Sequence, residues 1–346
     1  MSKYNYFLGK TNILINEEIN EGYFDVIKQN LLKYDKVLVV IDKNVAKLYP
    51  QISSKFLATN YKLIVSESGE QVKIIDSYIN FLSIFAKESL KRNDCVLVVG
   101  GGTLSDVVGF AVSTFKRGLK FCMMPTTFLS MIDSCLGGKN GINFEGKNMV
   151  GTFYEPDAVY INLNFLKTLP QKEILSGYGE LLKYVLLDKS FCEYFLKTKK
   201  HISPKIIKMS LGVKYKYFSK DVLDMGMRKN LNLGHTFAHA IEEKSKYMIS
   251  HGVAVLYGLK FILDISMKKF GEITQYKEIN EVFNNFEVNN ISYNIRELLP
   301  LMYKDKKNSN ENFIELILLK DIGEPLRCNF AAQELLEICH GNFNNK

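Results

Sequence analysis

Residues 95–106 read CVLVVGGGTLSD and join an apolar run to a run of glycines and the start of a helical pattern. The apolar run is rich in β-branched residues and stops abruptly at Gly100, which is typical of a buried strand. Glycines let backbone N–H groups approach an anion closely, and a helix N-terminus favours negative charge. The stretch therefore predicts a strand, a turn and a helix that together suit a phosphate. A tight turn without a ligand explains the glycines alone equally well.

Other segments of the first half repeat this alternation of strand and helix. Residues 36–41 and 61–65 are compact apolar runs that end in polar loop signals, and residues 72–91 have a helical pattern. Alternating strands and helices indicate parallel strands joined by crossover helices. Asp42 follows the first of these strands, where an acidic residue of a dinucleotide site binds a ribose hydroxyl.

Helical periodicity dominates from about Pro170, and a weaker strand-like run follows at 313–319. A chain of 346 residues is also too long for one typical core. We therefore expect an α/β nucleotide-binding domain at residues 1–169 and a mainly helical domain at residues 170–346.

The composition is that of an ordinary globular protein, with 47% hydrophobic and 24% charged residues. No apolar run is long enough to span a bilayer, and residues 1–10 lack a signal-peptide pattern, so we expect a cytoplasmic protein without membrane contact. The six cysteines form no CxxC pair, which argues against a disulfide framework and a cysteine metal site. The net charge of +8 is spread along the chain, so a small anionic substrate explains it as well as nucleic acid does.

Three of the five histidines lie in residues 228–252, RKNLNLGHTFAHAIEEKSKYMISHG. His235 and His239 are four residues apart and share one face of a helix, as two metal ligands often do. One buried and one surface histidine would give the same spacing. Glu180 and Lys183 have the spacing of an exposed helical ion pair, unless Glu180 joins His235 and His251 around a metal.

A glycine-permitted loop region carries several cations and amides between residues 125 and 148. Its polar residues include Asp133, Lys139, Lys147 and Asn148. Lysine supplies a mobile point charge with several donors, so the region suits a phosphate or carboxylate. A solvated connecting loop is the alternative interpretation.

Seven blocks of the sequence form one larger pattern. They are VVGGGTLSDVVGF (98–110), RGLKFCMMPTTFLSMIDSCLGGKNGIN (117–143), GKNMVGTFYEP (146–156), FLKTLP (165–170), SGYGELLKY (176–184), MRKNLNLGHTFAHAIE (227–242) and HGVAV (251–255). In this order and spacing they resemble the 3-dehydroquinate synthases of the sugar phosphate cyclase group, over nearly the whole chain. Each block alone is a modest signal, whereas the ordered set is specific.

The resemblance implies a Rossmann-like NAD-binding domain and a helical metal-binding domain with the active site in the cleft between them. It implies Zn²⁺, or alternatively Co²⁺, held by Glu180, His235 and His251. The positions that match the family's NAD contacts are Asp42, Asn44, Glu70, Lys73, Gly101, Gly102, Thr103, Asp106, Thr126, Thr127 and Lys139.

The resemblance also assigns the ends of an anionic sugar phosphate. Lys139, Asn232 and His239, joined by Lys307, match phosphate-binding positions, and Lys214 and Arg228 match carboxylate-binding positions. The remaining positions of the family's pocket are Asp133, Lys147, Asn148, Lys183 and Asp224. Arg117 matches an arginine that the family lends across a homodimer interface.

The implied reaction converts 3-deoxy-D-arabino-heptulosonate 7-phosphate into 3-dehydroquinate and phosphate, a step of aromatic amino acid biosynthesis through the shikimate pathway. NAD takes a hydride from C5 and later returns it, while zinc stabilises the charge that develops on the substrate oxygen. Phosphate leaves by elimination, and an intramolecular aldol step closes the carbocycle.

Some positions depart from the family pattern. Asp224 stands in place of the usual glutamate, Ala238 in place of a glycine and Val253 in place of an acid, and the turn at 143–146 is one residue shorter. None of these changes removes a proposed ligand or cation. Three alternatives remain: a sister cyclase of the 2-deoxy-scyllo-inosose or valiolone type, a metal-dependent alcohol dehydrogenase of related fold, and an inactive homologue. Lys214 and Arg228 argue against the first two, because a substrate without a carboxylate would leave these cations unpaired.

Overall fold

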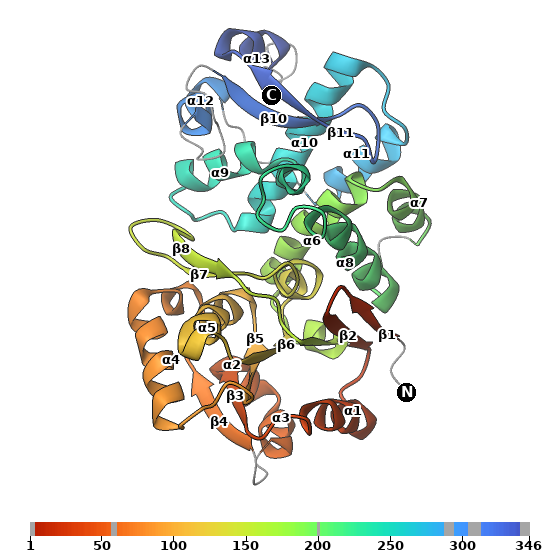
Figure 1. Cartoon of the computed structure of the whole chain (residues 1–346). Coiled ribbons are helices and arrows are strands. Elements are labelled where there is room, and N and C mark those ends of the chain that lie inside the picture. Colours follow the sequence, from red (N-terminus) through yellow and green to blue (C-terminus); the bar gives the residue numbers. More distant parts are fainter. Residues whose placement is uncertain (1–3, 57–60, 199–200, 287–293, 304–312, 340–346) are drawn as a thin grey trace. The chain divides into compact units, whose positions relative to one another are not determined.

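The computed structural model describes residues 4–56, 61–198, 201–286, 294–303 and 313–339. The chain divides into two compact units (Figure 1). Unit 1 comprises residues 1–174 and 202–223, and unit 2 comprises residues 175–201 and 224–346.

Unit 1 is built on a sheet that has seven strands among the described residues, in the order β1-β2-β9-β6-β5-β3-β4. The strands are β1 (Tyr4–Leu8), β2 (Thr11–Asn16), β3 (Val37–Asp42), β4 (Tyr61–Ser66), β5 (Cys95–Gly100), β6 (Lys120–Pro125) and β9 (Ala158–Asn162). All neighbours pair in parallel except the edge strand β1, which is antiparallel to β2. The carboxyl ends of the parallel strands therefore meet at one edge, where open α/β sheets bind their ligands.

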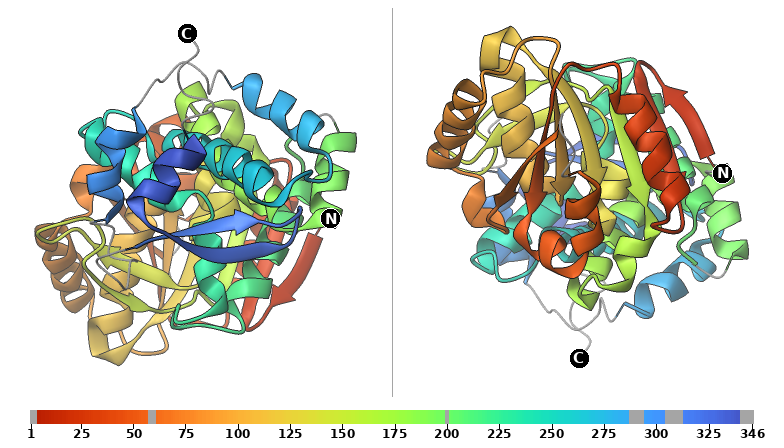
Figure 2. Two further views of the ribbon diagram at one scale, coloured as in Figure 1. Left: turned by 90° about the horizontal axis from the view of Figure 1, so that it is seen from above. Right: turned by 90° about the horizontal axis from the view of Figure 1, so that it is seen from below.

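Helices cover both faces of this sheet. The elements between and after the strands are α1 (Glu21–Leu31), α2 (Lys43–Leu48), α3 (Pro50–Lys55), η1 (Glu70–Val72), α4 (Ile75–Lys87), α5 (Gly102–Thr114), η2 (Phe115–Arg117), η3 (Ser130–Ser134), η4 (Leu163–Lys167) and α8 (Pro204–Phe218). Right-handed crossovers place α1, α2 and α3 on one face and α4 and α5 on the other, as Figures 1 and 2 show. Helix α8 packs against η3 and β1.

The core of unit 1 follows from the apolar runs in the sequence. Residues 37–41 and 95–99 are completely buried, because helices cover both faces of their strands. The predicted strands at 36–41, 61–65 and 95–99 and the helix predicted within 72–91 are confirmed as β3, β4, β5 and α4. A hairpin of β7 (Lys139–Ile142) and β8 (Val150–Phe153) leaves the sheet and packs on α5.

Unit 2 is mainly helical, as the sequence predicts. Its elements are α6 (Gln171–Leu186, which begins in unit 1), α7 (Lys189–Lys197), η5 (Met227–Asn232), α9 (His235–Lys244), α10 (His251–Phe270), α11 (Tyr276–Asn284), α12 (Ile295–Tyr303), β10 (Ile314–Leu319), β11 (Pro325–Phe330) and α13 (Ala332–Cys339). Helix α10 contacts α9, α11, α13 and the antiparallel hairpin β10–β11, which confirms the late strand (Figure 2). No helix in the described ranges has the length and apolar character needed to cross a membrane.

Candidate functional site

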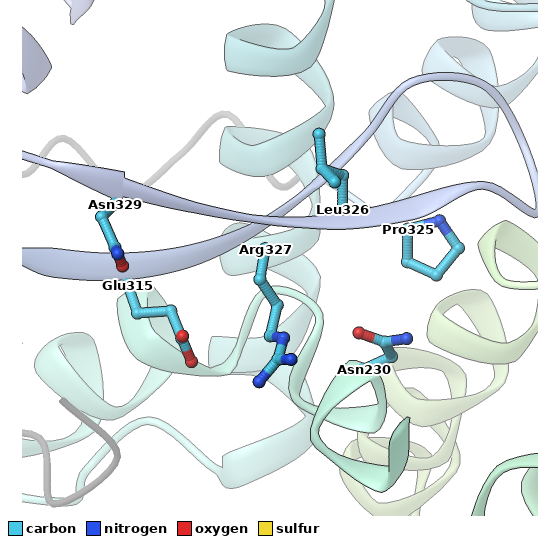
Figure 3. Close-up of a pocket in the computed structure, with 6 residues that line it drawn as sticks. All are labelled: Asn230, Glu315, Pro325, Leu326, Arg327 and Asn329. Atoms are coloured by element: carbon cyan, nitrogen blue, oxygen red, sulfur yellow. The ribbon is translucent and has the colours of Figure 1, made fainter. Parts of the chain in front are cut away.

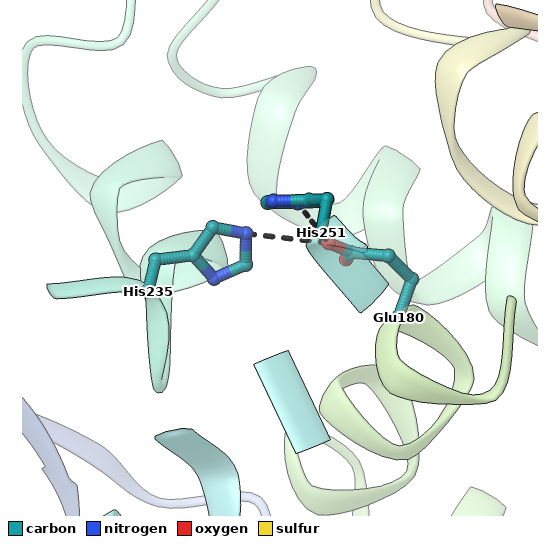
Figure 4. Close-up of side chains that lie close together, drawn as sticks. All are labelled: Glu180, His235 and His251. Carbon is teal, nitrogen blue, oxygen red and sulfur yellow. Dashed lines mark hydrogen bonds and ion pairs between the residues drawn. The ribbon is translucent and has the colours of Figure 1, made fainter. Parts of the chain in front are cut away.

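Three side chains from three helices of unit 2 converge on one point (Figure 4). Glu180 lies within α6, whereas His235 and His251 are the first residues of α9 and α10. The Nε2 atom of each histidine lies 3.2 Å from Glu180 Oε1. One potential ligand atom from each residue lies within 4.8 Å of the others. This is the trio that the resemblance assigns to the metal, and two histidines with one carboxylate are a familiar set of zinc ligands.

The second nitrogen of each histidine has its own acceptor. His235 Nδ1 lies 3.1 Å from the carbonyl oxygen of Leu233, and His251 Nδ1 lies 3.0 Å from Glu242 Oε2. A neutral imidazole with its proton on Nδ1 has its lone pair on Nε2. With Nδ1 engaged in this way, Nε2 is the nitrogen of each histidine that faces Glu180 and is left to bind a cation there.

Close backbone contacts at glycines bring the three residues together. A Cβ on Gly179 would lie 2.0 Å from the carbonyl oxygen of Gly252, so α6 and α10 touch directly beside Glu180 and His251. A Cβ on Gly258 would lie 2.0 Å from the carbonyl oxygen of Gly234, which precedes His235. Only glycine permits backbones to approach so closely. Each proposed ligand thus sits next to a glycine at a contact made with α10.

Glu180 is 1% exposed and remains ionised in this environment. Burial acts to raise the pKa of its carboxyl, but Lys183, which forms an ion pair with it, and the histidines outweigh burial and hold the pKa well below its usual value. For His251, burial acts to lower the pKa, but hydrogen bonds with Glu180 and Glu242 raise it to about 9. A buried anionic carboxylate between two imidazoles suits a divalent cation.

His239 lies beside this trio rather than within it. Its ring centroid is 5.7 Å from that of His235 and 6.2 Å from that of His251. A second group with metal-ligand spacing, His239, Glu242 and His251, shares only His251 with the first. The two histidines that are four residues apart therefore fall into different groups.

Glu242 is the site residue that sequence reasoning missed. It is 5% exposed and seven residues after His235 on α9, which places both on one side of the helix. The seven-residue spacing between His235 and Glu242 was the signal in the sequence that could have identified Glu242. The neighbouring Glu243 is exposed and has the same local sequence context, so the pattern alone could not tell the two apart.

The other predicted residues of unit 2 lie in or near η5. Arg228 is 2% exposed, and Asn232 is the last residue of η5, two residues before Gly234. Asp224 adopts a positive φ of 62° in the segment before η5. Lys307 lies outside the described residues.

In unit 1, one group of predicted NAD residues forms a connected network. Lys73 Nζ lies 2.5 Å from Asp106 Oδ2, and the Glu70 carboxylate accepts hydrogen bonds from Thr103 Oγ1 at 3.4 Å and Asn143 Nδ2 at 2.7 Å. Burial raises the pKa of Asp106 above its usual value, and the Lys73 ammonium opposes that rise.

The remaining predicted NAD residues lie at the carboxyl ends of β3, β5 and β6. The Asp42 carboxylate caps α2, accepting the backbone N–H groups of Asn44 at 2.8 Å and Val45 at 3.3 Å. Gly101 is the N-cap of α5 and Gly102 is its first residue; Cβ atoms there would lie 3.0 Å from Thr127 Cγ2 and 2.8 Å from Ser134 Oγ, respectively. Thr126 follows β6 directly and is buried. These loops thus meet at the edge where open α/β sheets bind nucleotides.

The predicted cations of unit 1 fall into two environments. Lys214, on α8, is 7% exposed and donates hydrogen bonds to the Asp133 carboxylate and, at 2.8 Å, to its carbonyl oxygen. Lys139 begins β7 and is exposed, and the exposed Lys147 and Asn148 lie in the turn of the same hairpin. Arg117 is exposed in η2 with a φ of 64°, and Lys183 of unit 2 pairs with Glu180.

A pocket of about 480 Å³ lies elsewhere in unit 2, beside the β10–β11 hairpin (Figure 3). Figure 3 shows Arg327 extending from the hairpin toward Asn230. The described residues that line it are Asn230, Glu315, Pro325, Leu326, Arg327 and Asn329, none of which the sequence assigned to the site.

Known proteins resemble this chain over most of its length. The chain is 38% identical to a 3-dehydroquinate synthase of Pelagibacter ubique (strain HTCC1062) over 336 residues, which covers 91% of this chain and 90% of that protein. A solved 2-deoxy-scyllo-inosose synthase in complex with carbaglucose-6-phosphate, NAD⁺ and Co²⁺ has a TM-score of 0.79 at 22% identity, covering 95% of this chain and 96% of that one. A 2-epi-5-epi-valiolone synthase of Streptomyces hygroscopicus subsp. jinggangensis 5008 with NAD⁺ and Zn²⁺ has a TM-score of 0.80 at 20% identity with the same coverage. At these identities, the two structures show a shared fold.

Two family models match consecutive parts of the chain. The 3-dehydroquinate synthase N-terminal model matches residues 63–176, and the 3-dehydroquinate synthase C-terminal model matches residues 177–308. The resemblance inferred from the seven sequence blocks is confirmed. The chain belongs to the 3-dehydroquinate synthase family.

Proposed function

We propose that the chain converts 3-deoxy-D-arabino-heptulosonate 7-phosphate into 3-dehydroquinate and phosphate, as a carbon–oxygen lyase that uses NAD and a divalent metal. The observation that carries the proposal is the convergence of Glu180, His235 and His251 in a member of this family. The names of the two solved cyclases add support, since each includes NAD⁺ together with Co²⁺ or Zn²⁺.

Glu180, His235 and His251 would hold the metal. They fit a divalent cation because the carboxylate is buried and ionised, and because the Nδ1 contacts of both imidazoles leave Nε2 facing the carboxylate. When bound, the metal supplies a Lewis acid for negative charge that develops on the substrate, and NAD supplies a reversible hydride acceptor.

Residues 1–169 would bind NAD, and residues 170–346 would bind the metal and the substrate. Backbone N–H groups at the start of α5 suit a pyrophosphate, and Asp42 suits a ribose hydroxyl. The other residues that we assign to NAD are Asn44, Glu70, Lys73, Gly101, Gly102, Thr103, Asp106, Thr126, Thr127 and Lys139. The assignment to residues 170–346 includes α8, which is part of unit 1 and carries Lys214.

The cations would divide between the two charged ends of the substrate. Lys214 and Arg228 are both buried and would hold the carboxylate, because charge-assisted hydrogen bonds strengthen away from water. Lys139, Asn232, His239 and Lys307 would hold the phosphate as its bond to carbon breaks. Holding both ends in fixed positions lowers the entropic cost of the elimination and of the later ring closure.

The remaining assigned residues have supporting roles. We assign Asp133, Lys147, Asn148, Lys183 and Asp224 to the same pocket. Asp133 would orient Lys214 through the hydrogen bonds that join them. Arg117 would complete the site from the partner subunit of a homodimer, in a cytoplasmic enzyme.

A sister cyclase is the second candidate, favoured by the two structural matches. Those matches are 20–22% identical, whereas the relative named 3-dehydroquinate synthase is 38% identical. The buried Lys214 and Arg228 also suit a carboxylate, which glucose 6-phosphate and sedoheptulose 7-phosphate lack.

The test is to incubate the purified chain with NAD and Zn²⁺ and to measure release of phosphate and formation of 3-dehydroquinate. We expect turnover of the heptulosonate phosphate and none of glucose 6-phosphate or sedoheptulose 7-phosphate. The reverse preference would replace the proposal by the sister-cyclase alternative. The Arg228→Ala variant should lose turnover and still bind zinc. An equal loss of zinc would contradict the division of roles.

A further inference from the structure

Glu242 is a buried carboxylate that contacts the proposed metal site but does not belong to the trio of ligands. Its side chain is 6% exposed, and its Oε2 atom lies 3.0 Å from His251 Nδ1. The other nitrogen of the same ring, Nε2, lies 3.2 Å from Glu180 Oε1. His251 therefore bridges two acidic residues, each of which faces one nitrogen.

His251 is shared by two groups that have metal-ligand spacing. One group contains Glu180 and His235, and the other contains His239 and Glu242. A neutral imidazole has one lone pair and one N–H, so His251 serves as a metal ligand for only one group at a time. The contact at Nδ1 determines which group that is.

His235 shows which arrangement the site favours. Its Nδ1 lies 3.1 Å from the carbonyl oxygen of Leu233, which only accepts hydrogen bonds, so the proton is on Nδ1. Nε2 of His235 then faces Glu180, 3.2 Å away, and is the nitrogen left to bind a metal. Glu242 occupies the corresponding position at His251 and is likewise an acceptor when ionised.

We propose that Glu242 is a positioning residue, which accepts the Nδ1–H of His251 and thereby directs its Nε2 lone pair toward the metal site formed with Glu180 and His235. Carboxylates in this position fix the tautomer and orientation of a metal-binding histidine and increase its basicity. The inference rests on the proposed function in one respect, namely that this site binds a divalent metal.

The position of Glu242 on α9 gives this role a structural basis. His235 begins α9 and Glu242 follows two turns later on the same side, so one helix supplies both a proposed ligand and the residue that orients another. His251 begins α10, which packs along α9. A shift between α9 and α10 would therefore disturb both histidines together.

The test measures zinc affinity by competition with a chromophoric chelator, which does not depend on turnover. Glu242→Met removes the acceptor while nearly keeping the volume, and we expect zinc affinity to fall about 10–100-fold. Glu242→Gln keeps an amide oxygen that accepts the same N–H, so we expect a smaller loss. Glu243→Gln is the matched control, because it removes the same charge from the next, exposed position of α9, and its affinity should equal that of the unaltered chain.

A second readout separates positioning from packing. The visible absorption spectrum of the Co²⁺-loaded chain reports ligand geometry, and we expect it to change in Glu242→Met and to recover in part in Glu242→Gln. If Glu242→Met does not fold, Glu242→Gln provides the test. The inference would be overturned if this variant had the same Co²⁺ spectrum and the same zinc affinity as the unaltered chain.

Three further outcomes decide between the explanations. Undiminished zinc affinity in folded Glu242→Met would overturn the inference while leaving the metal site in place. Equal, large losses in Glu242→Met and His239→Ala would also overturn it, because they would indicate that the metal binds to the second group. If the unaltered chain bound no zinc, the proposed function would fail first and this inference with it.

Discussion

Substituting alanine for Gly179 should disrupt metal binding through the backbone, without changing any proposed ligand. The new Cβ would lie 2.0 Å from the carbonyl oxygen of Gly252, whereas ordinary contacts begin at 3.4 Å, so α6 and α10 must separate by roughly 1.4 Å at this point. Glu180 and His251 are the residues next to this contact. Metal sites tolerate deviations of only about 0.2 Å in ligand distance, so the separation exceeds what one ion can bridge.

The measurable effects follow from this displacement. Overpacking of this kind lowers the free energy of unfolding by about 1–3 kcal/mol, which thermal or denaturant unfolding of the metal-free chain measures. We expect zinc affinity to fall at least about tenfold and turnover to fall by about 10²-fold, the effect of a 1 Å misplacement at a reacting site. Chelator competition measures the affinity, and phosphate release measures turnover.

Gly212 provides the matched control. It lies within α8, and a Cβ at this position would have no heavy atom within 4 Å. Gly212→Ala should leave zinc affinity unchanged and raise stability by up to about 1 kcal/mol, because alanine suits a helix interior better than glycine. The reasoning would be refuted if Gly179→Ala bound zinc with undiminished affinity, since the close contact would then not determine the ligand geometry.

Three further predictions concern the metal and two ion pairs of unit 1, Lys73–Asp106 and Lys214–Asp133. Removing the metal with a chelator should lower the melting temperature of the unaltered chain, because zinc at 1,000 times its Kd adds about 4 kcal/mol of stability. The melting temperature of Glu180→Gln should not fall. Equal falls in the two proteins would place the metal elsewhere. Lys73→Met leaves Asp106 without its ammonium partner, so we expect the free energy of unfolding to fall by about 1–3 kcal/mol. Calorimetry should show weaker NAD binding, and zinc affinity should stay unchanged. Lys214→Met should raise KM for the heptulosonate phosphate while NAD and zinc affinities stay the same; a loss of NAD binding instead would contradict the assignment of Lys214 to the substrate.

The sequence was sufficient for features that depend on neighbouring residues. The β5 strand and the start of α5 were predictable because an apolar run stops at glycines, and both signals lie within residues 95–106. The strands β1 and β2 were not predicted, since the segments 4–8 and 11–16 are short and β2 joins the sheet by pairing with β9, far along the chain. The burial of Lys214 likewise depends on the packing of α8 against η3, which joins segments about 80 residues apart.

Family resemblance supplied Glu180, His235 and His251 as a set, and residue spacing alone did not. The spacing of His235 and His239 suggested a shared metal, because four residues make one helical turn. In the structure, the atoms that meet Glu180 instead come from the first residues of two different helices. The close approach of α9 to α10 is determined where Gly234 meets Gly258, and that of α6 to α10 where Gly179 meets Gly252; no periodicity records these contacts.

The position of the two histidines at helix N-termini also explains why an acidic residue completes the trio. The first turn of a helix carries partial positive charge, and α9 and α10 each begin at a histidine whose Nε2 lies 3.2 Å from the buried Glu180. A carboxylate is stabilised there, whereas a third neutral ligand would leave the positive ends uncompensated beside a cation. The same electrostatics require an ionised Glu180, which agrees with the lowering of its pKa by Lys183 and His235. A pair of histidines one helical turn apart is therefore weak evidence of a metal site. A histidine at the start of a helix, with a glycine beside it and a buried acid facing it, is stronger evidence.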